Sequence, residues 1–150
     1  MYKLVIADDD EIQLQGMCCA FPWGELDIEV AAGVDDGDKA LKAAVEKQAD
    51  ILLTDIKMSN MDGLKLTEQI RSLCPDTRVV IMSAYDDFQF AQKALRLGVD
   101  DYLLKPIDLQ QMRETMRQIV YQKEEQKRNG QLQKRSSRLE EMVMEDEEIL

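Results

Sequence analysis

The sequence contains no histidine and three cysteines among its 150 residues. Cys18, Cys19 and Cys74 are odd in number, lie within apolar helical patterns and lack the spacing of metal ligands. With no histidine to complete a metal site and no basic group nearby in sequence to activate a thiol, chemical roles are disfavoured. We therefore expect three buried, inert cysteines.

Long hydrophobic runs and a basic excess are also missing. No apolar stretch approaches the roughly 18 residues of a membrane span, and Met1–Lys3 lead directly into a strand pattern without a signal-peptide core. The 19 basic side chains face 30 acidic ones, which gives a formal net charge of -11. Binding of nucleic acid by this segment is disfavoured, because a phosphate backbone requires a basic surface. We expect a cytoplasmic protein with no membrane contact.

What the sequence does contain is a regular alternation of short apolar runs and helical apolar stripes. A hydrophobic content of 45% over this length suffices for one core, so we expect one domain and an appendage. The predicted strands are 4–7, 28–33, 51–55, 79–83 and 101–106, and the predicted helices lie around 12–21, 40–45, 66–73, 88–95 and 109–120. Five such units with short connections predict a parallel, doubly wound sheet with helices on both faces.

The apolar positions also predict how the helices face the sheet. The inner positions are Ile12, Leu14, Met17, Cys18 and Phe21 in the first helix, Ala40, Leu41, Ala44 and Val45 in the second, Leu66, Ile70 and Leu73 in the third, Phe88, Ala91, Ala94 and Leu95 in the fourth, and Leu109, Met112, Met116, Ile119 and Val120 in the fifth. Phe90 and Leu97 fall outside this stripe, on the side that would face a partner. Two scattered exposed apolar side chains are equally ordinary on any surface.

Polar side chains stand where the predicted strands end. Asp8 and Asp9 follow the first strand, Asp55 ends the third, Ser83 ends the fourth and Lys105 lies in the fifth. Each alone has a plainer explanation as a helix cap, a strand-end hydroxyl or a surface charge. Together they gather at one edge of a parallel sheet, where ligands of such folds bind. Clustered carboxylates hold a proton or a cation, and oxygen ligands alone favour Mg²⁺.

These residues, in this order, resemble the receiver domain of two-component response regulators. The motifs are Asp8-Asp9, Asp55 followed by Lys57-Met58 and Met61-Asp62-Gly63, Ser83-Ala84, and Lys105-Pro106. The resemblance covers about residues 3–120 and implies an α/β, flavodoxin-like, five-stranded sheet in the order 2-1-3-4-5. It also implies a sensor histidine kinase as partner. The chain itself has no histidine, so the donor histidine must lie on another protein.

The same resemblance assigns roles to individual residues. Asp55 is implied to accept the phosphoryl group. Asp9, Asp55 and the backbone carbonyl of Lys57 are implied to bind Mg²⁺, while Asp8 holds a metal-bound water.

The remaining roles concern the phosphoryl oxygens and the switch. Ser83 is implied to bond those oxygens, Lys105 to pair with them, and Lys105-Pro106 to be a cis peptide. Phosphorylation draws Ser83 toward Asp55 and lets the Tyr102 ring turn inward, which reshapes the face made by helix four, strand five and helix five. One departure is Ser59, where the family usually has proline. It leaves the acceptor and metal positions intact.

The stretches 85–88 and 97–99, with Trp23-Gly24, are similar to the receivers of AraC-type, YesN-like regulators, in which a helix-turn-helix DNA-binding domain follows. No such domain occurs in these residues, so we expect a fragment of a longer protein that would bind DNA only through an absent output domain. A stand-alone receiver acting through protein contacts is the alternative. A rival from another class is a Mg²⁺-dependent phosphohydrolase with Asp55 as nucleophile, but such enzymes commonly carry an acid two residues later, where this chain has Lys57.

Residues 121–150 form the predicted appendage to a domain of residues 1–120. Asn129-Gly130 predicts a break in the helix. Beyond it, positions spaced by four and three, the spacing of a coiled coil, carry four apolar and two polar residues: Leu132, Ser136, Leu139, Val143, Asp146 and Leu150. We expect a helical linker that supports a homodimer. A frayed, solvated linker is the alternative, because the seam is short and carries polar residues.

Overall fold

We describe a computed structural model that covers residues 1–84 and 88–149, with side chains described for residues 1–84 and 89–130. Five strands form one parallel sheet in the order β2-β1-β3-β4-β5. They are β1 (Tyr2–Ala7), β2 (Ile28–Val34), β3 (Ile51–Asp55), β4 (Arg78–Ser83) and β5 (Asp101–Leu104). This confirms the doubly wound, flavodoxin-like order predicted above.

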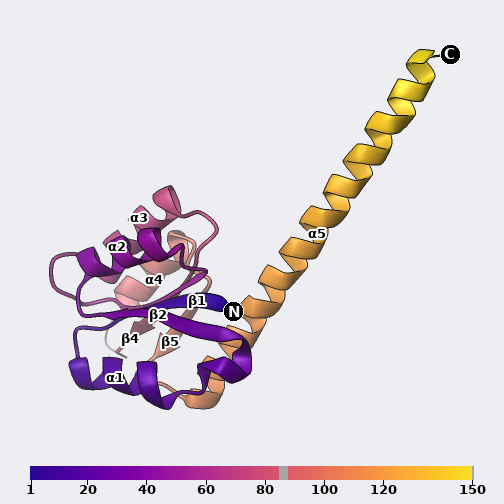
Figure 1. Ribbon diagram of the computed structural model, residues 1–150. Coiled ribbons are helices and arrows are strands. Elements are labelled where there is room, and N and C mark those ends of the chain that lie inside the picture. The colour runs from indigo at the N-terminus through magenta and orange to yellow at the C-terminus, as the bar shows by residue number, and fades with distance from the viewer. Residues whose placement is uncertain (85–87, 150) are drawn as a thin grey trace. The chain divides into compact units, whose positions relative to one another are not determined.

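Helices cover both faces of the sheet (Figure 1). They are α1 (Glu11–Ala20), α2 (Gly37–Lys47), α3 (Gly63–Leu73), α4 (Phe88–Arg96) and α5 (Leu109–Ile149), with a short 3-10 helix, η1 (Trp23–Leu26), after α1. Buried residues of α2, α3 and α4 pack with alternate residues of the central strands in one cluster. Because side chains of a strand alternate between its faces, Val5 and Leu52 face this cluster, while their neighbours Leu4 and Leu53 face the other side.

Aspartates begin four of these helices. Asp10 accepts from the backbone N–H groups of Ile12 and Gln13, and Asp36, Asp62 and Asp108 cap α2, α3 and α5 in the same way. A carboxylate at this position satisfies N–H groups that lack a partner in the helix and interacts favourably with the helix dipole. Asp10, which follows Asp8 and Asp9 after the first strand, is therefore a helix cap.

Several predicted inner positions are wrong. Ile12 is 86% exposed and Leu95 is 65% exposed, and Val45, Leu73 and Leu109 are exposed as well. Phe90, expected outside the inner stripe whether or not it faces a partner, is half-buried and packs against the core cluster. The side chain of Phe88 and residues 85–87, part of the stretch 85–88 above, lie outside the described residues. Helix periodicity predicts which residues share a face, but packing of neighbours decides how far that face is rotated toward the sheet.

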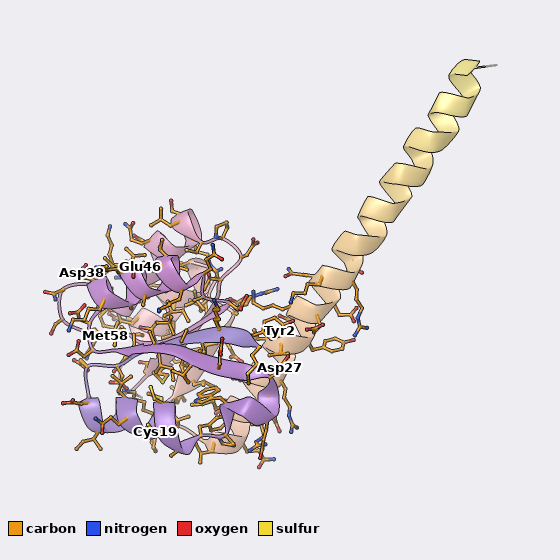
Figure 2. The ribbon with its side chains drawn as sticks, viewed as in Figure 1. Tyr2, Cys19, Asp27, Asp38, Glu46 and Met58 are labelled. Carbon is orange, nitrogen blue, oxygen red and sulfur yellow. The ribbon has the colours of Figure 1, made fainter. Side chains whose placement is uncertain are left out.

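Two other expectations also fail. Cys19 is exposed on α1 (Figure 2), whereas Cys18 and Cys74 are half-buried. The helix α5 runs through Asn129 and Gly130 without the predicted break, because one glycine weakens a helix by only about 1 kcal/mol.

The chain separates into two compact units, Met1–Met116 and Arg117–Leu150. The second unit is helical through Ile149, as the predicted extension requires. Its predicted coiled-coil seam, from Leu132 to Leu150, lies outside the described side chains. No helix in the described ranges, 1–84 and 88–149, is long and apolar enough to cross a membrane.

Candidate functional site

Three carboxylates meet at the carboxyl edge of the sheet. One oxygen from each of Asp8, Asp9 and Asp55 lies within 4.8 Å of the others. The ammonium group of Lys105 joins them, with Nζ 2.8 Å from Asp55 Oδ2 and 3.2 Å from Asp8 Oδ2. The structure thus brings together the acidic residues and the lysine that the sequence predicted at this edge.

Strand register explains why residues so distant in sequence meet. β1 pairs with β3 so that Ala7 lies opposite Thr54, which puts Asp8 beside Asp55 on adjacent strands about 4.8 Å apart. β5 lies beyond β4, and the backbone N–H of Lys105 donates to the Ser83 carbonyl at 2.7 Å. This hydrogen bond follows the last pair of the β4–β5 ladder and fixes the backbone of Lys105, whose side chain contacts Asp8 and Asp55. The Lys105-Pro106 bond is cis, as expected.

Burial sets the electrostatics of the site. Burial raises the pKa of Asp8, whose side chain is fully covered, and the nearby Asp55 charge adds to the rise. The backbone N–H of Asp10, 2.9 Å from Asp8 Oδ1, and the Lys105 charge oppose it without cancelling it. Burial also acts to lower the pKa of Lys105, but its hydrogen bonds and charge interactions with Asp55 and Asp8 outweigh that effect and raise it. Lys105 is therefore held as a cation between two carboxylates.

The donor set fits a hard divalent cation. Three carboxylates against one ammonium leave these four groups with a formal excess of two negative charges. Asp9 is exposed, Asp55 is partly buried and Asp8 is buried. The three candidate ligands all offer oxygen, which would suit Mg²⁺ and the waters it retains better than zinc or copper.

The other predicted residues lie around this cluster. Ser83 is buried at the end of β4, and its Oγ donates to the Ala84 carbonyl at 3.1 Å. Tyr102 lies opposite Ile81 in the β4–β5 ladder, and its ring packs against the core cluster with the hydroxyl covered. Lys57 is exposed in the loop after β3. The roles of these residues toward a phosphoryl group and a metal remain predictions.

Two residues that contact the backbone of Asp55 were given no role in the sequence analysis. Thr54 is buried next to Asp55, and its Oγ1 donates to the Asp55 carbonyl at 2.9 Å. Gly63 begins α3 directly against that carbonyl, and a side chain there would collide with the backbone of Asp55. The glycine in Met61-Asp62-Gly63 was a visible signal, since a glycine at the start of a helix often marks a close backbone approach.

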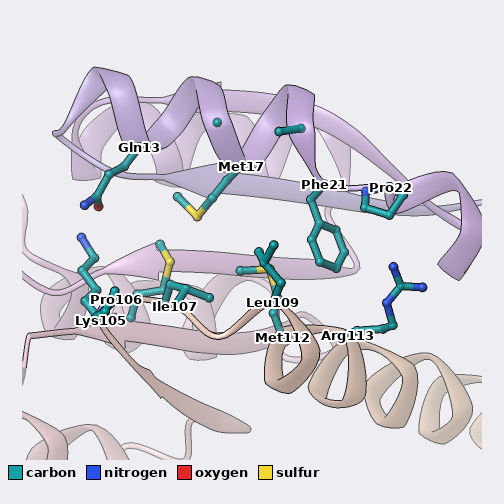
Figure 3. Close-up of a pocket in the computed structure, with 13 residues that line it drawn as sticks. Gln13, Met17, Phe21, Pro22, Lys105, Pro106, Ile107, Leu109, Met112 and Arg113 are labelled. Atoms are coloured by element: carbon teal, nitrogen blue, oxygen red, sulfur yellow. The ribbon is translucent and has the colours of Figure 1, made fainter.

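An apolar pocket of about 310 Å³ borders the site (Figure 3). Lys105 lines one end and Arg113 the other. The walls between them include Met17, Phe21, Met82, Ile107 and Met112. Exposed Leu109 also lines this pocket, which opens between α1 and the beginning of α5. The surface beside the carboxylates is thus apolar.

Comparison with known proteins gives a consistent result. The family model of the response regulator receiver domain matches residues 4–117. The uncharacterized transcriptional regulatory protein YesN of Bacillus subtilis (strain 168) is 35% identical over 120 residues, which are 80% of this chain and 33% of that protein. Transcriptional regulatory protein HptR of Staphylococcus aureus (strain NCTC 8325 / PS 47) is 35% identical over 131 residues, 87% of this chain and 51% of that protein. This chain therefore spans only a third to a half of these relatives.

Solved structures agree with the sequences. The REC domain of AraT, a response regulator from Geobacillus stearothermophilus, superposes with a TM-score of 0.80 at 39% identity, covering 84% of this chain and 98% of that one. A LuxR-family DNA-binding response regulator from Staphylococcus aureus superposes with a TM-score of 0.73 at 28% identity, covering 79% and 98%. Both likenesses extend over nearly the whole of the other chain.

Proposed function

The chain belongs to the response regulator receiver domain family, and on that premise we propose that it accepts a phosphoryl group on Asp55 from a sensor histidine kinase in a Mg²⁺-dependent reaction. The observation that carries the proposal is the Lys105 ammonium, 2.8 Å from Asp55 and 3.2 Å from Asp8, beside the exposed carboxylate of Asp9. The Asp55 side chain is only partly buried, and its carboxylate lies against a fixed positive charge. Those are the needs of a nucleophile that attacks an anionic group.

The chemistry follows from these positions. A carboxylate oxygen of Asp55 attacks the phosphorus of a phosphohistidine, the P–N bond breaks, and the imidazole leaves with the bonding electrons. Such transfer depends on positioning and charge stabilisation more than on proton transfer, so the absence of histidine from this chain is no obstacle. Lys105 is held where it can pair with a phosphoryl oxygen, and the Ser83 hydroxyl can donate to another. Mg²⁺, held by Asp9, Asp55 and the Lys57 carbonyl, would neutralise further charge.

Phosphorylation would act through Ser83 and Tyr102. We infer that Ser83 moves toward the phosphoryl group and that Tyr102, on the neighbouring strand, follows it and alters the α4–β5–α5 face. Because YesN and HptR are transcriptional regulators, the proposed output is control of transcription in the cytoplasm. DNA contact would come from a domain outside these 150 residues. The chain itself would be a phosphoryl acceptor and not a turnover enzyme.

The kinase should dock over the apolar pocket. An incoming phosphohistidine must reach Asp55, so its protein must contact the surface next to that residue. The pocket adjoins Lys105, and Ile12 and Leu109 lie exposed on the two helices that flank it. Apolar side chains exposed around a pocket are typical of a protein-binding surface.

The proposal is tested by intact mass. With Mg²⁺ and a small phosphodonor the chain should gain one phosphoryl group, and Asp55→Asn should gain none. Asp38→Asn is the matched control, because Asp38 is an exposed aspartate on α2 that is not one of the three clustered carboxylates. An equal gain in Asp55→Asn would overturn the assignment.

A homodimer through residues 121–150, the proposed linker of a receiver at 1–120, is a second part of the proposal. It rests on the four-three spacing of Leu132, Ser136, Leu139 and Val143 and on the helix that runs through them. Sedimentation of the full chain beside a version ending at Val120 tests it. Only the longer chain should increase in mass with concentration, and identical masses would exclude the tail from assembly.

A further inference from the structure

The loop that follows Asp55 is tied to the start of α2. The Asn60 side-chain amide donates to Asp36 Oδ2 at 3.2 Å, while Asp36 Oδ1 accepts from the Lys39 backbone N–H at 2.8 Å. The Gly37 backbone N–H donates to the Ser59 carbonyl at 3.3 Å, and residues 36 and 59 form an isolated parallel bridge. We call the Asp36–Asn60 side-chain contact and this backbone pairing the clasp.

The geometry of the clasp constrains two residue types. Asn60 has a φ of 68°, in the left-handed region that asparagine and glycine tolerate and most residues do not. Gly37 packs against Met61, and a Cβ at position 37 would overlap the Met61 carbonyl oxygen and side chain. The loop and the helix start therefore approach as closely as their backbones allow.

A second tie holds the base of the same loop. The Gly63 backbone N–H donates to the Ile56 carbonyl at 2.7 Å, and Ile56 is fully buried. Lys57 and Met58 thus lie between a fixed base and a tip held by the clasp. Lys57 is the residue whose backbone carbonyl is the proposed Mg²⁺ ligand.

We propose that Asp36 and Asn60 are positioning residues that hold this loop so that the Lys57 carbonyl faces the cation bound by Asp9 and Asp55. The inference rests on the proposed function and extends it to two residues outside the acid cluster. Mg²⁺ requires near-ideal octahedral geometry. A small displacement of the loop should therefore lower Mg²⁺ affinity with little effect on the stability of the fold. One oxygen of Asp36 caps α2 and the other accepts from Asn60 in the loop after β3.

The structure indicates that changes at Asn60 can alter Mg²⁺ binding without much loss of fold stability. Asn60 is exposed, and so is the hydrogen bond that its side-chain amide donates to Asp36. Exposed hydrogen bonds contribute little to global stability. The cap that Asp36 makes to Lys39 uses the other carboxylate oxygen and survives changes at Asn60.

The test is a charge exchange across the clasp, with Mg²⁺ affinity measured by calorimetry. Asn60→Asp keeps a residue that tolerates positive φ but places a second carboxylate against Asp36, so Mg²⁺ should bind at least fivefold more weakly. The direct attraction between an added carboxylate and Mg²⁺ would strengthen binding, so weakening must come from the broken contact with Asp36. In the double variant Asp36→Asn/Asn60→Asp the amide donates in the opposite direction, net charge returns to that of the parent, and affinity should recover to within twofold.

Two further variants complete the design. Asn60→Gly keeps the left-handed backbone and removes the amide, so it should weaken Mg²⁺ binding and speed amide hydrogen exchange in residues 57–61. Asp35→Asn is the matched control, since Asp35 is an exposed aspartate paired with Lys39. It should bind Mg²⁺ as the parent does.

The outcomes separate this inference from the proposed function. If the parent binds Mg²⁺ and both single variants at Asn60 bind it equally well, the clasp has no positioning role. Weakening that the double variant fails to reverse would also overturn the inference, because the effect would not pass through the Asp36–Asn60 contact. A parent chain that binds no Mg²⁺ would overturn the metal site itself.

Discussion

The two edges of the sheet use aspartate in opposite ways. At the amino edge, Asp100 accepts from Arg71 Nη2 and Arg78 Nη1, each at 3.0 Å, and from the Val79 backbone N–H at 2.7 Å. At the carboxyl edge, Asp8, Asp9 and Asp55 crowd together around Lys105. The amino edge gives one carboxylate two guanidinium groups and a backbone N–H. The carboxyl edge gives three carboxylates one ammonium and the backbone N–H groups of Asp10 and Ile56.

The difference separates an acid whose partners are supplied by the fold from the acids that we propose bind Mg²⁺. Asp100 joins α3, β4 and the start of β5 through partners the fold supplies, so it needs nothing from solution. The carboxyl-edge acids repel one another until a proton or a cation neutralises them. Counting aspartates therefore says little about function, whereas counting their fixed partners identifies the site. Four experiments test this comparison.

The largest expected effect follows from removing a cation at each edge. Lys105→Gln should slow phosphorylation by a small phosphodonor about 100-fold, the usual scale for losing one fixed charge or donor that stabilises a developing oxyanion. Arg71→Gln, at the amino edge, should leave the rate within about twofold. Intact mass followed over time measures both rates. Equal rates for the two variants would erase the functional distinction between the edges.

The free energy of unfolding should depend more on the amino edge than on the carboxyl edge. Asp100→Asn leaves two partly buried arginines without their counter-charge, so the free energy of unfolding should fall by about 2 kcal/mol. Asp9→Asn, measured without divalent metal, removes repulsion and should leave stability unchanged or higher. Urea unfolding in EDTA, followed by the fluorescence of buried Trp23, gives both values. A larger loss in Asp9→Asn than in Asp100→Asn would contradict the comparison.

Metal addition sharpens the contrast. Mg²⁺ at tenfold above its dissociation constant should stabilise the parent by about 1.4 kcal/mol, because only the native state holds the site. Asp100→Asn should show the same gain from a lower starting point, and Asp9→Asn should lose it. Melting curves with and without Mg²⁺ measure the shift. Equal responses in the parent and Asp9→Asn would remove Asp9 from the metal site.

The smallest effect concerns pH. Burial raises the pKa of Asp8 in the native state above its ordinary value of 3.8, so the native state binds this proton more tightly than the unfolded chain. In metal-free buffer the contribution of Asp8 to stability is therefore lost as pH rises from about 3.8 through the raised pKa. Asp8→Asn cannot titrate, and its stability relative to the parent should increase over that window. A difference that stays flat with pH would contradict the raised pKa.

The order of strands and polar residues along the chain was enough to predict much of the site. Residues that end parallel strands meet at one edge whatever else the sheet contains, so Asp8, Asp9, Asp55, Ser83 and Lys105 were predicted together before any contact was known. Alternation of strand and helix patterns likewise predicted the sheet and its winding. These features are local, because each depends on the spacing of a few neighbouring residues.

Tertiary structure alone decided which groups touch. Lys105 lies 97 residues from Asp8, Arg71 lies 29 residues from Asp100, and Asn60 lies 24 residues from Asp36. No local pattern relates such pairs, since each depends on strand register and on where a loop is anchored. The rotation of a helix about its axis is decided in the same way, which is why Leu95 was wrongly predicted to face the sheet.

Leu95 and Phe90 of α4 illustrate the point. Their sequence spacing correctly placed both on an amphipathic helix, but the sheet and α3 determined that Phe90 turns inward and Leu95 outward. The sequence by itself thus determined the order of the elements and the residues at the binding edge, because both follow from local periodicity. Only the tertiary structure decided the partners of each charge and the facing of each helix, because those depend on contacts between segments far apart in the chain.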